Sequence, residues 1–259
     1  MRTDYYRAWE PLLGVHDVSK GPLVVLTPHP DDEVLGAGGL ILGHRDHGQD
    51  VHVLIMTDGA MGDFGGEHDA GYVELRKNEA RAAASALGGA TVEFLDFPDG
   101  GLREQIATDE SGPIERVAAR LAEIGPATLA FPSPYELHPD HRATAIVGLA
   151  AAVGLTERPR LLAYEVGSFM PGNMLLDITH LFDRKVEALR CYASQLEHHD
   201  LVTKMSGLDT ARTANVPMPE ITRCEAYLRI EPGRAEEFLA ASEALLRLTD
   251  SMAPRVPYE

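Results

Sequence analysis

The chain has 259 residues, of which 44% are hydrophobic, and its 40 acidic and 23 basic side chains give a formal charge of −17. This length and hydrophobic content suffice for a buried core, which excludes a disordered or fibrous chain. The negative charge disfavours nucleic acid and anionic membranes as partners, because both would be repelled. We therefore expect a globular protein that acts on a small neutral or cationic molecule.

The N-terminal segment 1–20 carries polar and charged side chains throughout and lacks the apolar stretch of a secretory signal, so we expect a cytoplasmic protein. The longest weakly polar run, residues 143–155, is shorter than the roughly 20 residues of a bilayer-spanning helix, so no membrane span is expected. Cys191 and Cys224 are far apart in the sequence and are expected to be free thiols. The composition does not decide the oligomeric state, and a homo-oligomer is compatible with it.

Short apolar runs alternate with longer segments of helical spacing, which is typical of a parallel sheet with crossover helices. The pattern predicts an α/β fold with a Rossmann-like parallel sheet flanked by helices. We expect one domain over 1–259, with a core at about 21–196 and a small C-terminal elaboration at 197–259. The expected strands are 23–27, 51–57, 92–97, 128–132 and 161–166, with 224–230 as a late antiparallel or edge strand. The expected helices are 33–47, 73–87, 114–124, 142–153, 178–196 and 234–248.

Three intervals lack this rhythm, namely 59–71, 99–112 and 201–220. The first is rich in glycine and follows the end of an expected strand, where α/β proteins usually bind ligands. We expect it to be a substrate loop. The other two are expected to be irregular, either capping the site or serving as plain surface loops.

A His-Pro-Asp figure occurs twice, at 29–32 and at 138–141, each time between an expected strand and an expected helix. Proline is favoured at the first helical position, and residues three apart in the first turn lie on one side of a helix. In the doubly wound strand order 3-2-1-4-5, the strands that precede the two figures are neighbours, so the figures meet. Either figure alone is explained by helix initiation. Together their imidazoles and carboxylates predict a divalent-cation site that suits Zn²⁺ and leaves a position for water.

Longer segments around these figures resemble the PIG-L/LmbE-type zinc-dependent N-deacetylases, a family of N-acetylglucosaminyl deacetylases. Residues 28–33, followed by Gly36-Ala37-Gly38-Gly39, are similar to the family's first signature, and residues 138–142 are similar to its second. Segments 76–80 and 185–195 are similar to two further helical elements. The resemblance covers roughly 23–195. We interpret the three glycines of the first signature as close-packing positions between helix and strand.

The resemblance implies that His29, Asp32 and His141 are the metal ligands, with Zn²⁺ as the ion and Fe²⁺ or another divalent ion as the alternative. Two neutral ligands and one carboxylate would leave a divalent ion with a net positive charge, which lowers the pKa of bound water. Asp31 cannot easily share the ion with its neighbour, so it is expected to be the general base. The resemblance also implies that His138 is the oxyanion partner, acting in its charged form.

Three further residues have expected roles. Asp140 is expected to orient a ligand imidazole or to hold His138 in its charged form. The resemblance implies that Arg76 helps to hold the sugar, and the alternative is a surface arginine paired with a glutamate of its own helix. Glu136 stands where the mycothiol-pathway enzymes have a tyrosine. We expect Glu136 to contact the substrate, where an acid would favour an additional amine.

These expectations together predict a hydrolase that removes an acyl group, with acetyl favoured, from the amine of an N-acylated amino sugar or sugar conjugate. One alternative is an amidase that acts on a larger amide conjugate. Another is a sugar- or nucleotide-binding module without catalysis. The binding module is disfavoured because every expected ligand and the expected base are present in the sequence.

Overall fold

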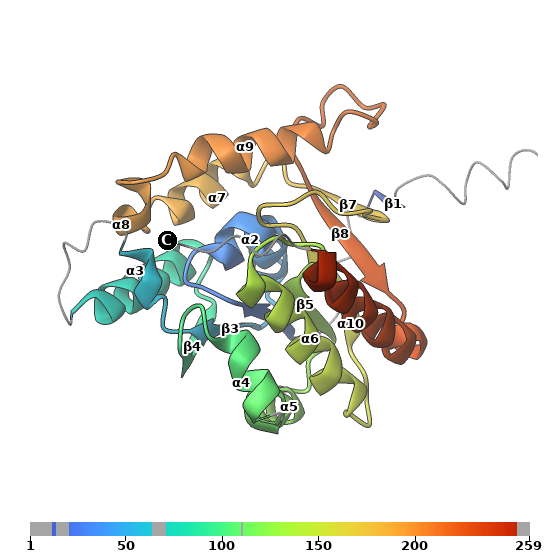
Figure 1. Ribbon diagram of the computed structural model, residues 1–259. Helices are drawn as coiled ribbons and strands as arrows, with labels where there is room; N and C mark the ends of the chain where they lie inside the picture. Colours follow the sequence, from blue (N-terminus) through green and yellow to red (C-terminus); the bar gives the residue numbers. More distant parts are fainter. Residues whose placement is uncertain (1–11, 14–20, 64–70, 110, 253–259) are drawn as a thin grey trace, which may run out of the picture.

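The computed structural model describes residues 12–13, 21–63, 71–109 and 111–252. Its centre is a sheet in the order β1-β7-β8-β6-β5-β2-β3-β4 (Figure 1). The parallel part comprises β2 (Leu23–Thr27), β3 (Val51–Thr57), β4 (Thr91–Phe97), β5 (Thr128–Pro132) and β6 (Arg160–Tyr164). These strands follow the expected 3-2-1-4-5 order from β4 to β6, which confirms the α/β class. The neighbourhood of β2 and β5 brings the two His-Pro-Asp figures to one edge of the sheet.

Helices cover both faces of the sheet (Figure 1). Leu23 and Val25 of β2 pack into a core on one face, whereas Val24 and Leu26 pack into a second core on the other. The first core includes residues of α2 (Asp32–Asp46), α3 (Tyr72–Ala86) and α7 (Phe182–Leu189). The second includes residues of α4 (Leu102–Thr108), α5 (Ser111–Ile124), α6 (Pro139–Val153) and α10 (Ala235–Met252). Burial on both faces explains why β2 has a continuous apolar sequence.

The helix expected over 178–196 is wrong in its extent. The chain forms a short strand, β7 (Met174–Asp177), then α7, and then the separate helix α8 (Ala193–Leu196). Tyr192 breaks the helical path with a non-helical backbone, φ −87° and ψ 59°. Its ring is fully buried, and its hydroxyl donates a hydrogen bond to the Glu33 carboxylate. The burial of Tyr192 therefore takes precedence over continued helix.

Two intervals expected to be irregular contain helices. The helix α9 (Leu201–Ala211) begins after Asp200, whose carboxylate accepts the Thr203 N–H at 3.0 Å. Such a cap satisfies one of the backbone donors that every helix leaves unpaired at its start. The helix α4 occupies most of the interval 99–112. Single-turn 3₁₀ helices lie at Ala60–Gly62 and Pro232–Arg234.

The late strand β8 (Cys224–Ile230) is antiparallel, as expected, to both β6 and β7. It is not at the edge, because β7 and β1 (Leu12–Leu13) lie beyond it. The Glu225 carboxylate of β8 accepts the backbone N–H groups of Gly39 and Leu40 in α2, which ties this strand to the core. A Cβ atom at Gly36 would lie 2.3 Å from the ring of Tyr164, so the expected close packing of helix on strand is confirmed there.

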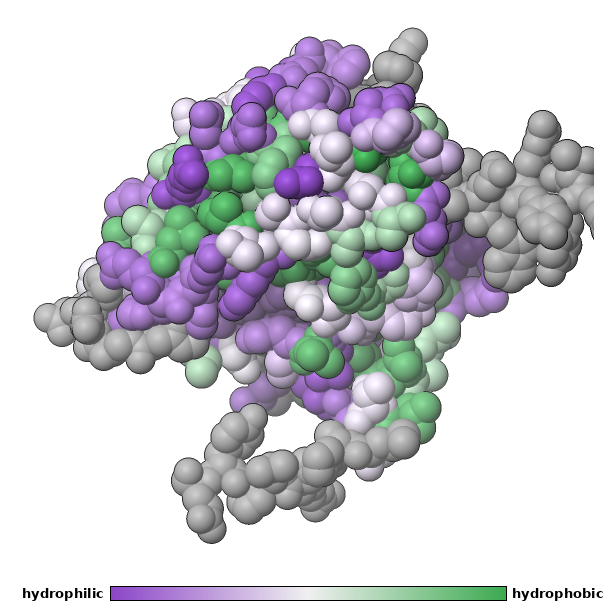
Figure 2. All heavy atoms as spheres, turned by 90° about the horizontal axis from the view of Figure 1, so that it is seen from above, coloured by the Kyte–Doolittle hydropathy of each residue, from purple (hydrophilic) through white to green (hydrophobic). Residues whose placement is uncertain are grey.

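On the face seen from above, hydrophobic residues are interspersed with hydrophilic ones (Figure 2). Exposed large hydrophobic side chains of the described residues include Met61, Leu137 and Phe169. Among the helices of the described ranges, none is long and apolar enough to cross a bilayer.

Candidate active site

The site is built around the link between β2 and α2. Asp31 ends this link with φ 120°, a conformation that side-chain-bearing residues rarely adopt, and its backbone N–H donates to Glu33 Oε2 at 3.1 Å. Such unusual backbone geometry recurs at functional sites, where the surrounding structure holds it in place. Burial raises the pKa of Asp31 to about 7, against the opposing charge of Arg76. A carboxylate with this pKa is suited to exchange protons near neutral pH.

Asp32 lies between two imidazoles. Its Oδ2 atom is 3.0 Å from Nδ1 of His29 and 3.2 Å from Nε2 of His141. Oxygen and nitrogen ligands of one tetrahedral zinc ion, each about 2.1 Å from the metal, stand about 3.4 Å apart. Each of the two imidazole nitrogens is therefore spaced from the Asp32 oxygen about as two ligands of one ion would be. The side chains of the three predicted ligands therefore lie together, and their role as metal ligands stays a prediction.

Without a cation, protons occupy these imidazoles. Burial opposes the charged form of His141, but the Asp32 carboxylate raises its pKa to about 9. Burial likewise opposes ionisation of Asp32, but His141 and His29 lower the pKa of that carboxyl well below its usual value. A cation at this position would have to displace protons from imidazole nitrogens.

Two other groups of donor atoms are close enough to hold an ion. One combines His29 with His138 and His141, and the other combines His29 with Asp99 and Asp140. The first is weaker because Nδ1 of His138 already accepts the Asp140 N–H at 3.2 Å. The second is weaker because the Asp140 carboxylate accepts the backbone N–H groups of Gly100 and of Leu102, the first residue of α4. These competing hydrogen bonds favour the predicted set that includes Asp32.

Asp99 is a site residue that the sequence analysis missed. Its Oδ1 atom lies 3.1 Å from Nε2 of His29, and its other oxygen accepts the Met61 N–H at 2.9 Å. Asp140 approaches the same nitrogen of His29 at 3.4 Å. The available signal was its position, because Asp99 follows the carboxyl end of a parallel strand, as the two His-Pro-Asp figures do.

His138 is the N-cap of α6 and lies at the mouth of the site. Its ring centroid is 4.8 Å from that of His29 and 5.1 Å from that of His141. Burial and these two neighbouring imidazoles lower the pKa of His138. Because its Nδ1 accepts a hydrogen bond, the neutral ring carries its proton on Nε2. The lowered pKa and this hydrogen bond favour a neutral ring that donates through Nε2 over the charged form expected from the sequence.

Arg76 is buried, with 2% of its surface exposed, so the alternative of a surface arginine is wrong. Its guanidinium donates to the Pro30 carbonyl and lies 3.5 Å from Asp31 Oδ2. Both contacts hold the strained Asp31 segment. Arg76 also lines the cavity above the site and is therefore within reach of a ligand.

The cavity has a volume of about 610 Å³, and its lining combines His29, Asp31, Asp99, Arg76 and His138. Of the expected substrate loop 59–71, its first turn contributes to the lining, whereas residues 64–70 lie outside the described residues. The structure thus brings together two carboxylates, an arginine and two imidazoles at the carboxyl edge of the sheet.

Glu136 does not contribute to this lining. Its carboxylate is 2% exposed and accepts the backbone N–H groups of Val166, Gly167 and Ser168. The expected contact between Glu136 and substrate does not fit this position. The side chain instead lies beneath the site, with Oε2 3.7 Å from Nδ1 of His141.

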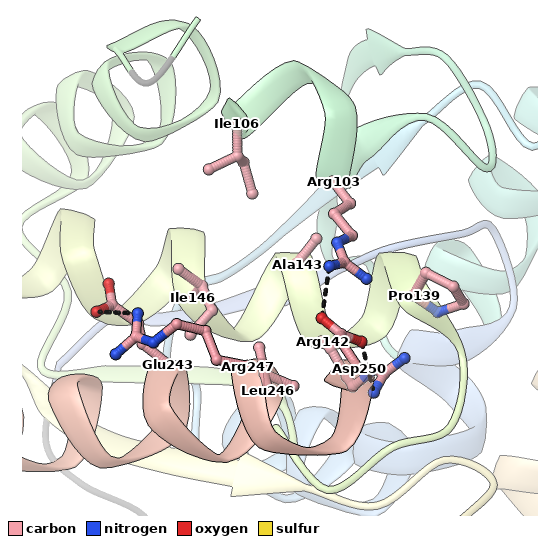
Figure 3. A pocket seen from close by; sticks show the side chains of 10 residues that line it. All are labelled: Arg103, Ile106, Pro139, Arg142, Ala143, Ile146, Glu243, Leu246, Arg247 and Asp250. Atoms are coloured by element: carbon pink, nitrogen blue, oxygen red, sulfur yellow. Dashed lines mark hydrogen bonds and ion pairs between the residues drawn. The ribbon is translucent and has the colours of Figure 1, made fainter. Parts of the chain in front are cut away.

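A second cavity, of about 270 Å³, lies between α4, α6 and α10 (Figure 3). Arg103 and Asp250 meet across it at 2.5 Å, with Arg142 at 3.9 Å from the same carboxylate. Glu243 pairs with Arg247 along α10 at 3.7 Å. The ion pairs across this cavity connect α10 to α4 and α6. Because its charged side chains are paired with one another and its described lining includes no histidine, this cavity is not the candidate active site.

Comparison with known proteins agrees with this geometry. Residues 24–152 match the family model described as PIG-L, GlcNAc-PI de-N-acetylase. Diacetylchitobiose deacetylase of Thermococcus kodakarensis is 32% identical over 197 residues, which cover 70% of this chain and 71% of that protein. This chain belongs to the PIG-L family.

Members of the PIG-L family are not all named for deacetylation. The 4-oxalmesaconate hydratase of Pseudomonas putida is 28% identical, with 74% of this chain and 82% of that protein covered. Among solved structures, the conserved protein TT1542 of Thermus thermophilus has a TM-score of 0.69 at 26% identity. That similarity covers 81% of this chain and 94% of the other.

Proposed function

We propose that this protein is a divalent-metal-dependent amidohydrolase that removes an acetyl or similar acyl group from the amine of an N-acylated amino sugar or its conjugate. The observation that carries the proposal is the Asp32 oxygen between two imidazole nitrogens, beneath a cavity lined by Asp31 and His138. The relative named as a diacetylchitobiose deacetylase supports an N-acetylated sugar as substrate.

His29, Asp32 and His141 would hold the ion, for which Zn²⁺ is the first choice and Fe²⁺ the alternative. When bound, the ion would supply a Lewis acid that lowers the pKa of water. The chain supplies the proton transfers and the stabilisation of charge.

Asp31 is the proposed general base. Its carboxylate accepts a proton from the water whose oxygen bonds to the acyl carbon, and it later delivers that proton to the nitrogen as the carbon–nitrogen bond breaks. Arg76, 3.5 Å away, orients this carboxylate, and burial keeps the pKa of Asp31 close to neutrality. The products are a free amine and a carboxylic acid.

His138 is the proposed oxyanion partner. The attack of water on an amide places negative charge on the carbonyl oxygen, and a fixed hydrogen-bond donor stabilises that charge. The Asp140 N–H occupies Nδ1 of His138, which leaves the Nε2–H free to donate into the cavity. A neutral His138 also avoids placing a third positive charge beside His29 and His141.

Hydration of a carbon–carbon double bond is the second candidate, because a named hydratase is among the relatives. A substrate with several carboxylates would meet Asp31 and Asp99 in the cavity, where Arg76 is the buried cation and already faces Asp31. Repulsion between these charges favours a neutral sugar substrate.

The experiment is an assay of amine release from N-acetylated sugars and glycosides by the zinc-loaded protein and its Asp31→Asn variant. We expect the variant to retain zinc and to lose at least a hundredfold in kcat. The exposed Asp46→Asn is the matched control and is expected to keep wild-type activity, because Asp46 pairs with Arg184 on the surface. Near-normal turnover by Asp31→Asn would remove Asp31 from the mechanism. Turnover of an unsaturated acid without amine release from any amide would favour the hydratase.

A further inference from the structure

We infer that the two imidazoles facing Asp32 are held in opposite tautomers, and that Glu136 is the positioning residue for His141. The inference rests on the proposed metal site and names how its ligands are oriented. Histidine ligands generally donate their second ring nitrogen to a carboxylate or carbonyl, which fixes both the tautomer and the ring orientation.

His29 presents Nδ1 to Asp32. Its opposite nitrogen, Nε2, lies 3.1 Å from the Asp99 carboxylate and 3.4 Å from that of Asp140. Carboxylates accept and do not donate when ionised, so the proton of a neutral His29 belongs on Nε2. The lone pair on Nδ1 then points toward the Asp32 oxygen, 3.0 Å away.

His141 has the reverse arrangement. Its Nε2 atom lies 3.2 Å from the Asp32 oxygen, whereas its Nδ1 atom is buried and has no hydrogen-bond partner within the described structure. The group nearest to serve Nδ1 is Oε2 of Glu136, at 3.7 Å. A small approach of these two groups completes the hydrogen bond, which places the proton on Nδ1 and leaves Nε2 free to coordinate.

The surroundings of Glu136 suit this task. Its carboxylate accepts three consecutive backbone N–H groups, at 2.8 Å from Val166, 3.1 Å from Gly167 and 3.3 Å from Ser168. These donors stabilise the charge in a buried place and fix the carboxylate in one orientation. Oε2 accepts from Gly167 alone, which leaves an acceptor position for His141.

The test is zinc affinity, measured by competition with a chromophoric chelator, for the full chain and its Glu136→Gln variant. The glutamine oxygen retains an acceptor for the backbone N–H groups, but its amide would present a donor to Nδ1 of His141. We expect a 10- to 100-fold loss of zinc affinity, roughly the effect of removing such a partner elsewhere. The matched control is Glu165→Gln, since Glu165 is also buried and accepts the Met170 N–H of the same loop. We expect this control to bind zinc within about twofold of wild type.

Nitrogen-15 NMR of the zinc-loaded wild type tests the same inference without a variant that might misfold. We expect His141 to carry its proton on Nδ1 and His29 to carry its proton on Nε2. Equal zinc affinity of Glu136→Gln and wild type, or the same tautomer at both histidines, would overturn the inference while leaving the proposed function intact. A wild type that binds no zinc or other divalent ion would overturn both.

Discussion

Lys185 is fully buried in α7, and we expect its ion pairs with the C-terminal region to contribute strongly to the free energy of unfolding. Its Nζ atom lies 2.9 Å from the carboxylates of both Asp209 in α9 and Glu225 in β8. Glu225 also accepts hydrogen bonds from α2 and from the Tyr227 hydroxyl. The substitution Lys185→Met keeps a side chain of similar length and removes only the cation.

The expected cost is about 3–5 kcal/mol, because removal of one partner leaves buried carboxylates without compensation. Burial already raises the pKa of Asp209 to about 6 with Lys185 present. Without the cation that pKa rises further, so the folded state of the variant binds more protons than the unfolded chain at pH values above about 4. Its stability therefore falls as the pH rises, and its deficit relative to wild type is smaller at pH 5 than at pH 8.

Urea unfolding followed by circular dichroism, in the presence of chelator, measures this cost. The matched control is Lys77→Met, which removes a lysine paired with the half-exposed Asp96 and is expected to cost no more than about 1 kcal/mol. A double variant, Lys185→Met with Asp209→Asn, should recover part of the loss. A Lys185→Met deficit no larger than that of the control, or one that grows on acidification, would refute this reasoning.

Gly36→Ala places a methyl group against the ring of Tyr164 and should lower the free energy of unfolding, measured in urea, by about 1–3 kcal/mol. Gly207→Ala meets open space within α9 and should raise the free energy of unfolding by about 0.5–1 kcal/mol. Equal effects of the two substitutions would contradict the close-packing argument. In steady-state assays, kcat/KM should fall with decreasing pH as Asp31 gains a proton. The fall should occur at or below pH 7, because the pKa of Asp31 is about 7 without a metal ion and a bound cation lowers it by favouring the charged form. Activity that rises on acidification would exclude Asp31 as the base. Zinc binding at pH 7 should release protons, because the pKa of His141 is about 9 before the ion binds. Calorimetry in buffers of different ionisation enthalpy should detect the released protons, and zero release would contradict the proposed ligand set.

The strand order and the meeting of the two His-Pro-Asp figures could be predicted from sequence because they depend on regular patterns. Buried parallel strands have continuous apolar runs, and proline marks the first turn of a helix. Once the strand order is known, His29 and His141 must lie at one edge of the sheet. The close packing at Gly36 could also be predicted from sequence, because the three glycines in one helix allow another element to approach closely.

Other features depend on contacts that no local pattern records. Glu136 was expected to reach substrate, but its direction is decided by the backbone N–H groups of residues 166–168, which come from another strand end. Asp99 stands alone in a turn without a histidine beside it. The strand β7 has only four residues, too few for a recognisable period. Tyr192 ends a helix that its sequence would allow to continue, because its ring and hydroxyl are satisfied in the core.

The most direct test of the account is the release of free amine and acetate from an N-acetylated amino sugar, such as diacetylchitobiose, by the purified protein loaded with one equivalent of Zn²⁺. The account predicts equal amounts of amine and acetate, loss of both on chelation, and recovery on addition of Zn²⁺ or another divalent ion. Absence of amine release across N-acetylated sugars and their conjugates, from protein that holds a stoichiometric metal at His29, Asp32 and His141, would contradict it.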